Sequence, residues 1–251
     1  MKQVDTVIER FEQEIGTRKI IGTLFNSKIK DEKSSSLIIL IHGFLSSKED
    51  LYFIAENLSK KGHDVLSLDM YAHGESEGDF KNLTISKCVS DLHEIISSFK
   101  EMKTYSTYSL FGHSIGGYIT LSYCVKYSDI NSIVLSAPVS DFNDLFKTAD
   151  FREWKENNML TDKILGLNIR LNYDFFIDGI EMFDYEKAKN MQVKTLIIHG
   201  SEDSIVPIEQ SNKLTKALKH STLYLISNAE HDNLYSVDKG VLDLVSEFYK
   251  N

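Results

Sequence analysis

The stretch LFGHSIGG at residues 110–117 decides how the rest of this chain is interpreted. An apolar run typical of a buried strand ends at Gly112, and an apolar helical pattern begins at Ile115. Gly112 and Gly116 lack the Cβ atoms that would collide in a sharp turn between strand and helix. In this setting the pattern G-x-S-x-G predicts a strained turn that exposes the Ser114 hydroxyl as a nucleophile. A glycine-rich turn that only serves packing is the alternative.

Outward from this turn, strand and helix patterns alternate from residue 36 onward. Apolar runs predict strands at 37–41, 64–69, 108–112, 132–136, 195–199 and 223–226. Apolar residues at helical spacing predict helices at 48–60, 83–102, 208–219 and 235–249. The segments 4–11 and 19–26, joined by Gly16-Thr17, predict an antiparallel pair at the sheet edge. The expected fold is α/β, with a mostly parallel eight-stranded sheet flanked by helices.

Residues 141–193 interrupt this alternation. An unstructured loop of this length is improbable in a compact domain. We therefore expect a small helical cap inserted into a core domain formed by residues 1–140 and 194–251. The segment is rich in aromatic residues and holds the only tryptophan, Trp154. Its aromatic side chains either form the core of the cap or partly face a substrate cleft beneath it.

A serine hydroxyl needs a base to accept its proton, and histidine is the usual one. His199, His220 and His231 lie well downstream of Ser114. His220 precedes its strand, at the wrong end of the sheet, and His199 has no suitable acid before it except in the insertion. His231 follows the last strand, at the carboxyl edge where active groups gather. We therefore predict His231 as the base; a solvated loop histidine is the alternative.

The acid that orients this imidazole is predicted to be Asp203, just beyond a strand and before a helix. Glu202, Asp141 and Asp144 are rivals, and Asp203 could instead only cap the helix. An oxyanion needs two backbone N–H donors, which we expect from Ile115 and Phe44. His42 is expected to brace the loop that carries Phe44 rather than to take part in catalysis.

These residues give the chain a resemblance to serine hydrolases of the α/β-hydrolase superfamily. The resemblance covers roughly residues 20–250. It rests on the segments 42–44, 69–76, 112–117, 199–203 and 230–231. Ser114, Asp203 and His231 match the nucleophile, acid and base of that superfamily. The resemblance therefore implies the fold and the triad that chain order also indicates.

Within the superfamily the chain is most similar to small bacterial cinnamoyl (feruloyl) esterases. The pointers are the run HGESEGDF at residues 73–80 and the size of the insertion. Tyr71 and Ala72 depart from the arginine and glycine common at those positions. Polar groups in the insertions of such esterases hold a phenolic hydroxyl, so the resemblance suggests Asp141, Tyr173 and Tyr185 as substrate-binding residues. Trp154 joins them as an aromatic candidate.

The expected function is carboxylic ester hydrolysis through an acyl-enzyme, on small apolar or aromatic esters of the cinnamoyl or feruloyl type. No metal or organic cofactor is required. Monoacylglycerol lipase, thioesterase or peptidase activity on the same triad is an alternative. A non-hydrolytic lyase or ligand-binding protein of this fold is another.

The composition of the chain limits which classes of partner we expect it to bind. The net charge is −9, and only four of the 251 residues are arginines, which argues against a nucleic-acid surface. The longest apolar stretch is too short for an integral membrane span. The two cysteines form neither a disulfide framework nor a metal cluster. Without a visible secretory signal the default is a cytoplasmic monomer or homodimer that binds a small-molecule ester.

Overall fold

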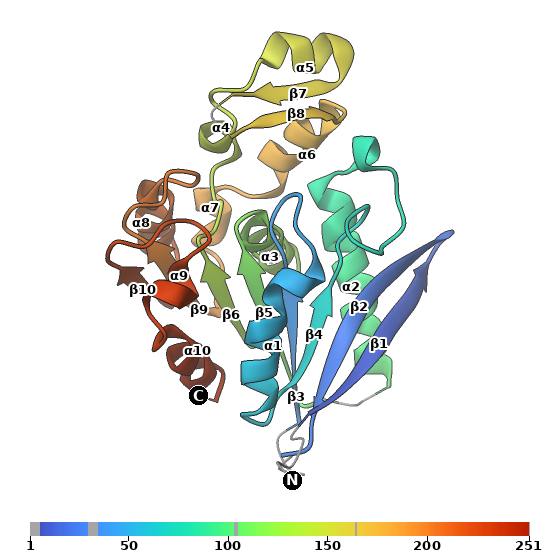
Figure 1. The fold of residues 1–251 in the computed structure, drawn as a ribbon, viewed down its shortest axis with the longest axis vertical. Helices are drawn as coiled ribbons and strands as arrows, with labels where there is room; N and C mark the ends of the chain where they lie inside the picture. Colours follow the sequence, from blue (N-terminus) through green and yellow to red (C-terminus); the bar gives the residue numbers. More distant parts are fainter. Residues whose placement is uncertain (1–5, 30–34, 103–104, 164, 251) are drawn as a thin grey trace.

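The computed structural model describes residues 6–29, 35–102, 105–163 and 165–250. In this part of the chain, eight strands form one twisted sheet in the order β1-β2-β4-β3-β5-β6-β9-β10 (Figure 1). The strands are β1 (Thr6–Ile15), β2 (Arg18–Ser27), β3 (Ser36–Ile41), β4 (Asp64–Leu68), β5 (Thr107–His113), β6 (Ser132–Ser136), β9 (Lys194–Gly200) and β10 (Ser221–Ile226). β1 and β2 pair antiparallel, as do β2 and β4, and the other neighbours are parallel. The prediction of a mostly parallel eight-stranded sheet is confirmed.

Helices cover both faces of this sheet because its central strands are apolar on both sides. In β3, Leu37, Ile39 and Ile41 pack with residues of α2, α3 and α8, whereas Ile38 and Leu40 pack with α1 and α10. The helices of these two layers are α1 (Tyr52–Ser59), α2 (Ile85–Glu101), α3 (Ile115–Lys126), α8 (Ile208–Ala217) and α10 (Val241–Lys250). None of the helices in the described residues is long and apolar enough to span a membrane.

Three short helical segments complete the core: η1 (Lys48–Leu51), η2 (Phe80–Asn82) and α9 (Leu234–Val237). The single helix expected over 235–249 is wrong in its middle, because α9 ends at Val237 and α10 begins at Val241. The carboxylate of Asp238 accepts the backbone N–H of Gly240, 2.9 Å away, and this turn separates the two helices. Apolar spacing continues across the break, so periodicity alone did not reveal it.

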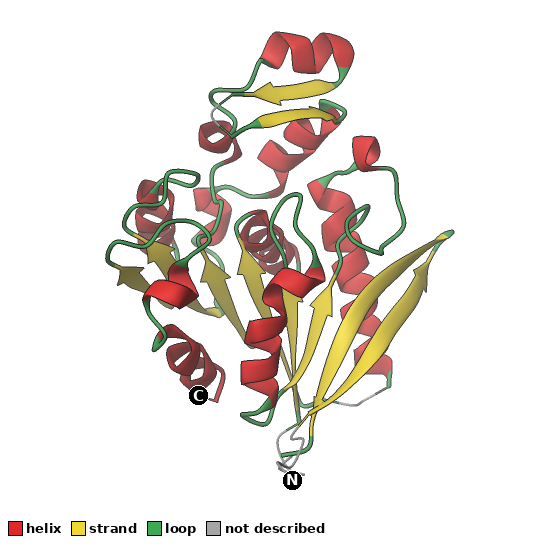
Figure 2. Cartoon of the chain, viewed as in Figure 1, coloured by secondary structure: helices red, strands yellow, loops and turns green. Residues whose placement is uncertain are grey.

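The segment between β6 and β9, here called the insertion, lies at the carboxyl ends of the parallel strands (Figures 1 and 2). Its elements are α4 (Phe142–Leu145), α5 (Phe151–Asn157), β7 (Met159–Asp162), β8 (Leu167–Arg170), α6 (Asp174–Met182) and α7 (Tyr185–Ala188). The sequence predicted helices here but not the antiparallel hairpin β7–β8. Asn158 has a left-handed φ of 54°, which turns the chain from α5 into β7 without a glycine.

Tyr118 of α3 ties the insertion to the core. Its hydroxyl donates to the Gly179 carbonyl oxygen at 2.6 Å, and its ring centre lies 4.5 Å from that of Phe142. A Cβ on Gly179 would lie 2.2 Å from the Phe142 ring, so only glycine permits this contact. The helix that follows Ser114 is therefore packed directly against the insertion.

Candidate active site

Ser114 sits in the sharp turn between β5 and α3 with a φ of 55° and a ψ of −120°. The strained backbone is possible because Gly112 has no Cβ. A Cβ there would lie 2.4 Å from the Gly116 carbonyl oxygen. A Cβ at Gly116 would lie 2.2 Å from the carbonyl oxygen of Ile41. Both glycines therefore allow the close approach of strand and helix that the sequence predicted.

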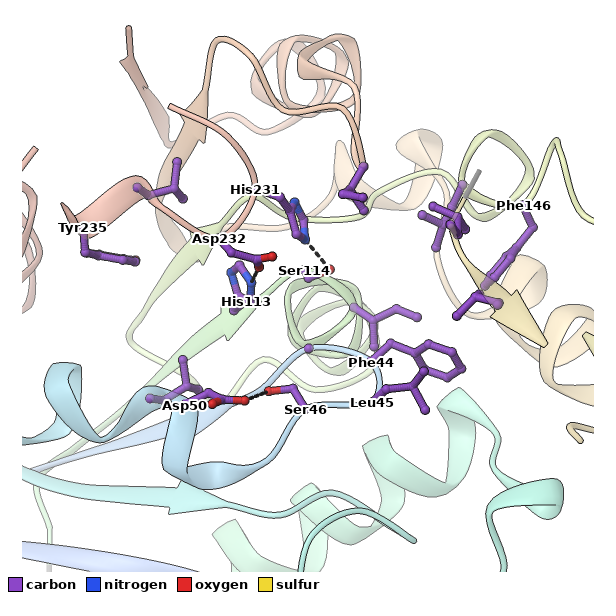
Figure 3. A pocket seen from close by; sticks show the side chains of 18 of the residues that line it. Phe44, Leu45, Ser46, Asp50, His113, Ser114, Phe146, His231, Asp232 and Tyr235 are labelled. Atoms are coloured by element: carbon purple, nitrogen blue, oxygen red, sulfur yellow. Dashed lines mark hydrogen bonds and ion pairs between the residues drawn. The ribbon is translucent and has the colours of Figure 1, made fainter. Parts of the chain in front are cut away.

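His231 lies in the loop after β10, 117 residues after Ser114, and its side chain contacts that serine. Its Nε2 is 2.9 Å from Ser114 Oγ, as the dashed line in Figure 3 marks. A Cβ at Gly200 would lie 2.2 Å from the Ala229 carbonyl oxygen, so the loop packs tightly on the end of β9. The ring itself is 7% exposed, which keeps it fixed but open to the cavity.

Asp203 stands behind this histidine. Its Oδ2 is 2.7 Å from His231 Nδ1, and its Oδ1 accepts the backbone N–H groups of Ile205 and Val206. Burial alone would raise the pKa of Asp203, but hydrogen bonds from His199 and His231 hold it well below its usual range. The carboxylate is thus ionised at neutral pH and can stabilise an imidazolium.

Sequence reasoning missed the contact between His199 and the acid. His199 is fully buried, with Nε2 3.2 Å from Asp203 Oδ2 and Nδ1 2.7 Å from Ser211 Oγ. It therefore holds the acid and does not face Ser114. The usable signal was its place at the end of β9, four residues before Asp203. His220 lies just before β10, at the opposite end of the sheet.

The rival acids have other partners. Asp141 caps α4 by accepting the N–H of Asp144 at 3.1 Å. The carboxylate of Asp144 accepts hydrogen bonds from Gln210 and Lys147. Glu202 is exposed.

The predicted oxyanion donors are the backbone N–H groups of Phe44, in the loop after β3, and of Ile115, directly after Ser114. A Cβ at Gly43 would lie 3.4 Å from Ser114 Cβ, so the loop after β3 approaches the serine closely. Ile115 is the first residue of α3, where N–H groups have no acceptor within the helix. Neither N–H has an acceptor among the described residues. Both are therefore available to an oxyanion formed at Ser114.

Two buried histidines brace the loop that carries Phe44. His42 Nε2 accepts the N–H of Met70 at 3.0 Å, and His73 Nε2 accepts the N–H of Leu45 at 3.3 Å. The brace therefore joins the loop after β3 to the loop after β4. Burial lowers the pKa of His42 to about 4, and burial also lowers the pKa of His73. Both accept hydrogen bonds as neutral rings.

This brace should make stability depend on pH. The unfolded chain takes up a proton on His42 near pH 6.5, whereas the folded chain does so only near 4. Protons therefore favour unfolding in this window, and stability is lost as the pH falls. We expect the free energy of unfolding to drop by about 3 kcal/mol for His42 between these limits. Urea unfolding at pH 7, 5.5 and 4 measures it. His42→Gln, which keeps an acceptor but does not titrate, should show a shallower slope; equal slopes would contradict the prediction.

A buried ion pair between Lys48 and Asp69 also joins the loops after β3 and β4. The sequence analysis did not identify it. Lys48 Nζ lies 2.7 Å from Asp69 Oδ2 and 2.8 Å from Glu75 Oε2. Asp69 also accepts the backbone N–H groups of Lys48 and Glu75, at 2.8 and 2.9 Å. Gly74 has a φ of +53°, and a Cβ there would lie 2.3 Å from the Asp69 carboxylate. Hydrogen bonds from Lys48 and Arg10 lower the pKa of Glu75 to about 2.

A cavity of about 620 Å³ opens beside Ser114 and has two unlike arms. Figure 3 shows Phe44, Leu45 and Phe146 on one side of the serine, and Asp50, Asp232 and Tyr235 on the other. The first side, here called the apolar arm, is formed by Phe44, Leu45 and Phe146, and the insertion adds Leu145, Leu165 and Leu167 to the lining of the cavity. The second side, here called the polar arm, includes Ser46, Asp50, His113, Asp232 and Tyr235, with Phe53 packed on Tyr235. Leu51, Ile205 and Leu234 also line the cavity.

The predicted substrate-binding residues need correction, because none of the four lines this cavity. Trp154 is fully buried in the aromatic core of the insertion, and its indole N–H donates to the Leu171 carbonyl oxygen. Tyr173 stacks within the same aromatic group. The hydroxyls of Tyr185 and Ser140 bond to each other at 2.9 Å, and Asp141 is a helix cap. Sequence reasoning instead missed the lining residues of both arms, except for Phe44, His231 and the elbow itself.

One group in the described residues has the composition of a metal site. Ligand atoms of His113, His231 and Asp232 lie within 4.8 Å of one another, and His113 Nε2 is 3.5 Å from Asp232 Oδ1. His231 is also the residue bonded to Ser114, so a cation held there would compete with proton transfer from the serine.

Comparison with known proteins places these observations in context. The family model described as "Serine aminopeptidase, S33" matches residues 32–174. The AB hydrolase superfamily protein YisY of Bacillus subtilis is 24% identical, over 90% of this chain and 95% of that protein. The human serine hydrolase BPHL is 27% identical, over 78% of this chain and 72% of that protein.

Among solved structures, Est1E from Butyrivibrio proteoclasticus, with ferulic acid bound, superposes with a TM-score of 0.85. It is 22% identical, and the match covers 96% of this chain and 98% of that one. At this identity the likeness concerns the fold.

Proposed function

This chain belongs to the α/β-hydrolase superfamily, in the family described as serine aminopeptidase S33, and from that premise we propose that it hydrolyses carboxylic esters through a serine acyl-enzyme. The observation that carries the proposal is the hydrogen-bonded series from Asp203 through His231 to Ser114. The two distances, 2.7 and 2.9 Å, are those of a nucleophile, a base and an orienting acid.

The reaction follows from this order. Ser114 Oγ attacks the ester carbonyl carbon while His231 Nε2 takes the hydroxyl proton. Asp203 stabilises the imidazolium and keeps the ring in the required tautomer. His231 then gives the proton to the departing alcohol, and the ester C–O bond breaks. A water molecule, deprotonated by His231, hydrolyses the acyl-serine and restores the enzyme.

The N–H groups of Phe44 and Ile115 stabilise the oxyanion of each tetrahedral intermediate. Donors that are already oriented need no reorganisation when charge develops, which makes this one of the larger contributions to catalysis. The braces from His42 and His73 keep the Phe44 donor in place.

The apolar arm supports an apolar acyl group. The side chains of Phe44, Leu45 and Phe146 in this arm are apolar, and so are the three leucines that the insertion adds to the cavity. No described side chain in this arm can pair with the phenolic hydroxyl of a feruloyl group. We therefore propose aliphatic or unsubstituted aromatic acyl groups, rather than hydroxylated ones, as the preferred substrates.

Matched methyl esters test this proposal. We expect turnover of methyl cinnamate to exceed that of methyl ferulate by about ten-fold in kcat/KM, because burying an unpaired hydroxyl costs about 1–3 kcal/mol. Medium-chain p-nitrophenyl esters establish the basal activity, and Ser114→Ala gives the blank. A preference for ferulate would overturn the acyl assignment. Faster turnover of amino-acid p-nitroanilides than of all esters would instead favour an aminopeptidase.

A further inference from the structure

The alcohol part of an ester departs beside His231, which returns the proton to its oxygen, and the polar arm adjoins His231 (Figure 3). The leaving oxygen takes its proton from His231, and His231 is followed directly in the chain by Asp232. Figure 3 shows His231, Asp232 and His113 together, with Asp50 and Tyr235 farther along the same side. This inference rests on the proposed ester hydrolysis, because it concerns which residues bind the alcohol part of the same ester.

Both charged groups of this arm are carboxylates. Asp50 Oδ2 accepts the hydroxyl of Ser46 at 2.6 Å, which fixes the direction of that side chain. Asp232 contacts His113, and this hydrogen bond lowers the pKa of Asp232 although burial acts against it. Among the described residues that line the cavity there is no lysine or arginine. The fixed charges of the arm are therefore negative, and His113 is the described partner that Asp232 has within it.

Two aromatic rings line the same cavity as these carboxylates. The ring centres of Phe53 and Tyr235 are 5.2 Å apart in an edge arrangement, and Phe53 is 44% exposed. Tyr235 is fixed by its hydroxyl, which donates to Ser136 Oγ at 3.0 Å. Carboxylates together with aromatic faces form the surface that recognises substituted ammonium groups.

We propose that the polar arm selects the alcohol part of the substrate by charge, so that esters of alcohols bearing an ammonium group are preferred. A neutral alcohol of the same shape lacks the attraction to Asp50 and Asp232. An anionic alcohol is repelled by both. The apolar arm thus binds the acyl group of the ester, and the polar arm binds its alcohol part.

The test compares butyrylcholine with 3,3-dimethylbutyl butyrate, which have the same acyl group and nearly the same shape but differ in charge. The measured quantity is the ratio of their kcat/KM values. We expect Asp50→Asn/Asp232→Asn to lower this ratio by about ten-fold, and each single change by about three-fold, as for partly screened charges. Phe53→Leu should lower it as well, without any change of charge. Differences in the intrinsic reactivity of the two esters cancel between native protein and variant.

Asp243→Asn is the matched control, because this exposed carboxylate pairs with Lys61 and does not line the cavity. It should leave the ratio unchanged. The neutral ester reports on folding and on the triad in every variant. If that ester is hydrolysed but the ratio stays the same in the double variant, the charge selection is wrong. If neither ester is hydrolysed by a Ser114-dependent reaction, the proposed function itself fails, and the inference with it.

Discussion

Replacing Ser114 by alanine lowers kcat for a neutral ester by about 10⁵- to 10⁶-fold, and adding His231→Ala to that variant lowers it little further. The two side chains act as one unit, since the base 2.9 Å from Ser114 Oγ has no proton to accept once the hydroxyl is gone. His231→Ala alone should therefore cost nearly as much as Ser114→Ala. Single-turnover and steady-state rates on p-nitrophenyl butyrate measure all three variants.

The background needs a control, because traces of another esterase would hide losses of this size. Ser122→Ala changes a buried serine eight residues later on the same helix, away from the cavity lining, and should keep native activity. If Ser114→Ala retained more than about a hundredth of native activity, Ser114 would not be the nucleophile. Additive losses in the double variant would show that His231 acts on a different step.

Replacing Asp69 by alanine lowers the free energy of unfolding by about 3–5 kcal/mol. Asp69 is fully buried and accepts three hydrogen bonds, two of them from Lys48. Without the carboxylate, the ammonium of Lys48 stays in the interior with weaker compensation from the half-exposed carboxylates of Glu49 and Glu75. Thermal unfolding should shift by about 10 °C for a chain of this size.

Two variants separate burial from charge pairing. Arg10→Ala removes the exposed contact of Arg10 with Glu75, 2.7 Å in length, and should change the free energy of unfolding little, because solvent screens such a pair. Lys48→Met/Asp69→Leu removes both buried charges and should recover much of the stability lost in Asp69→Ala. An Asp69→Ala protein that melts within about 2 °C of the native protein contradicts the prediction.

The parts of the molecule that sequence predicted share a local cause. Strands such as β3 and β9 are short apolar runs that end at glycine or histidine, and the elbow at Ser114 needs only its neighbours at 112 and 116. The positions of His231 and Asp203 follow from chain order and strand ends. These signals lie within a few residues, so a single sequence carries them.

The parts that could not be predicted depend on how distant segments pack. Trp154 and Phe146 lie eight residues apart, and their buried rings pack against each other, yet only Phe146 lines the cavity. Nothing in their spacing distinguishes them, because the difference depends on how the insertion sits on the sheet. Asp50 and Asp232 likewise stand 182 residues apart, and no local pattern in the sequence marks either of them. Only the fold brings both carboxylates to one cavity.

The contact of Tyr118 with Gly179 and Phe142 determines which residues must be exchanged together when the insertion is replaced by that of a homologue. Tyr118 belongs to the helix that follows Ser114, whereas its two partners belong to the insertion. A chimera that imports the insertion of a homologue must import a compatible residue at 118 as well, since a mismatched pair leaves a buried hydroxyl without its acceptor. Crossover points placed only at the ends of the insertion would cut through this contact.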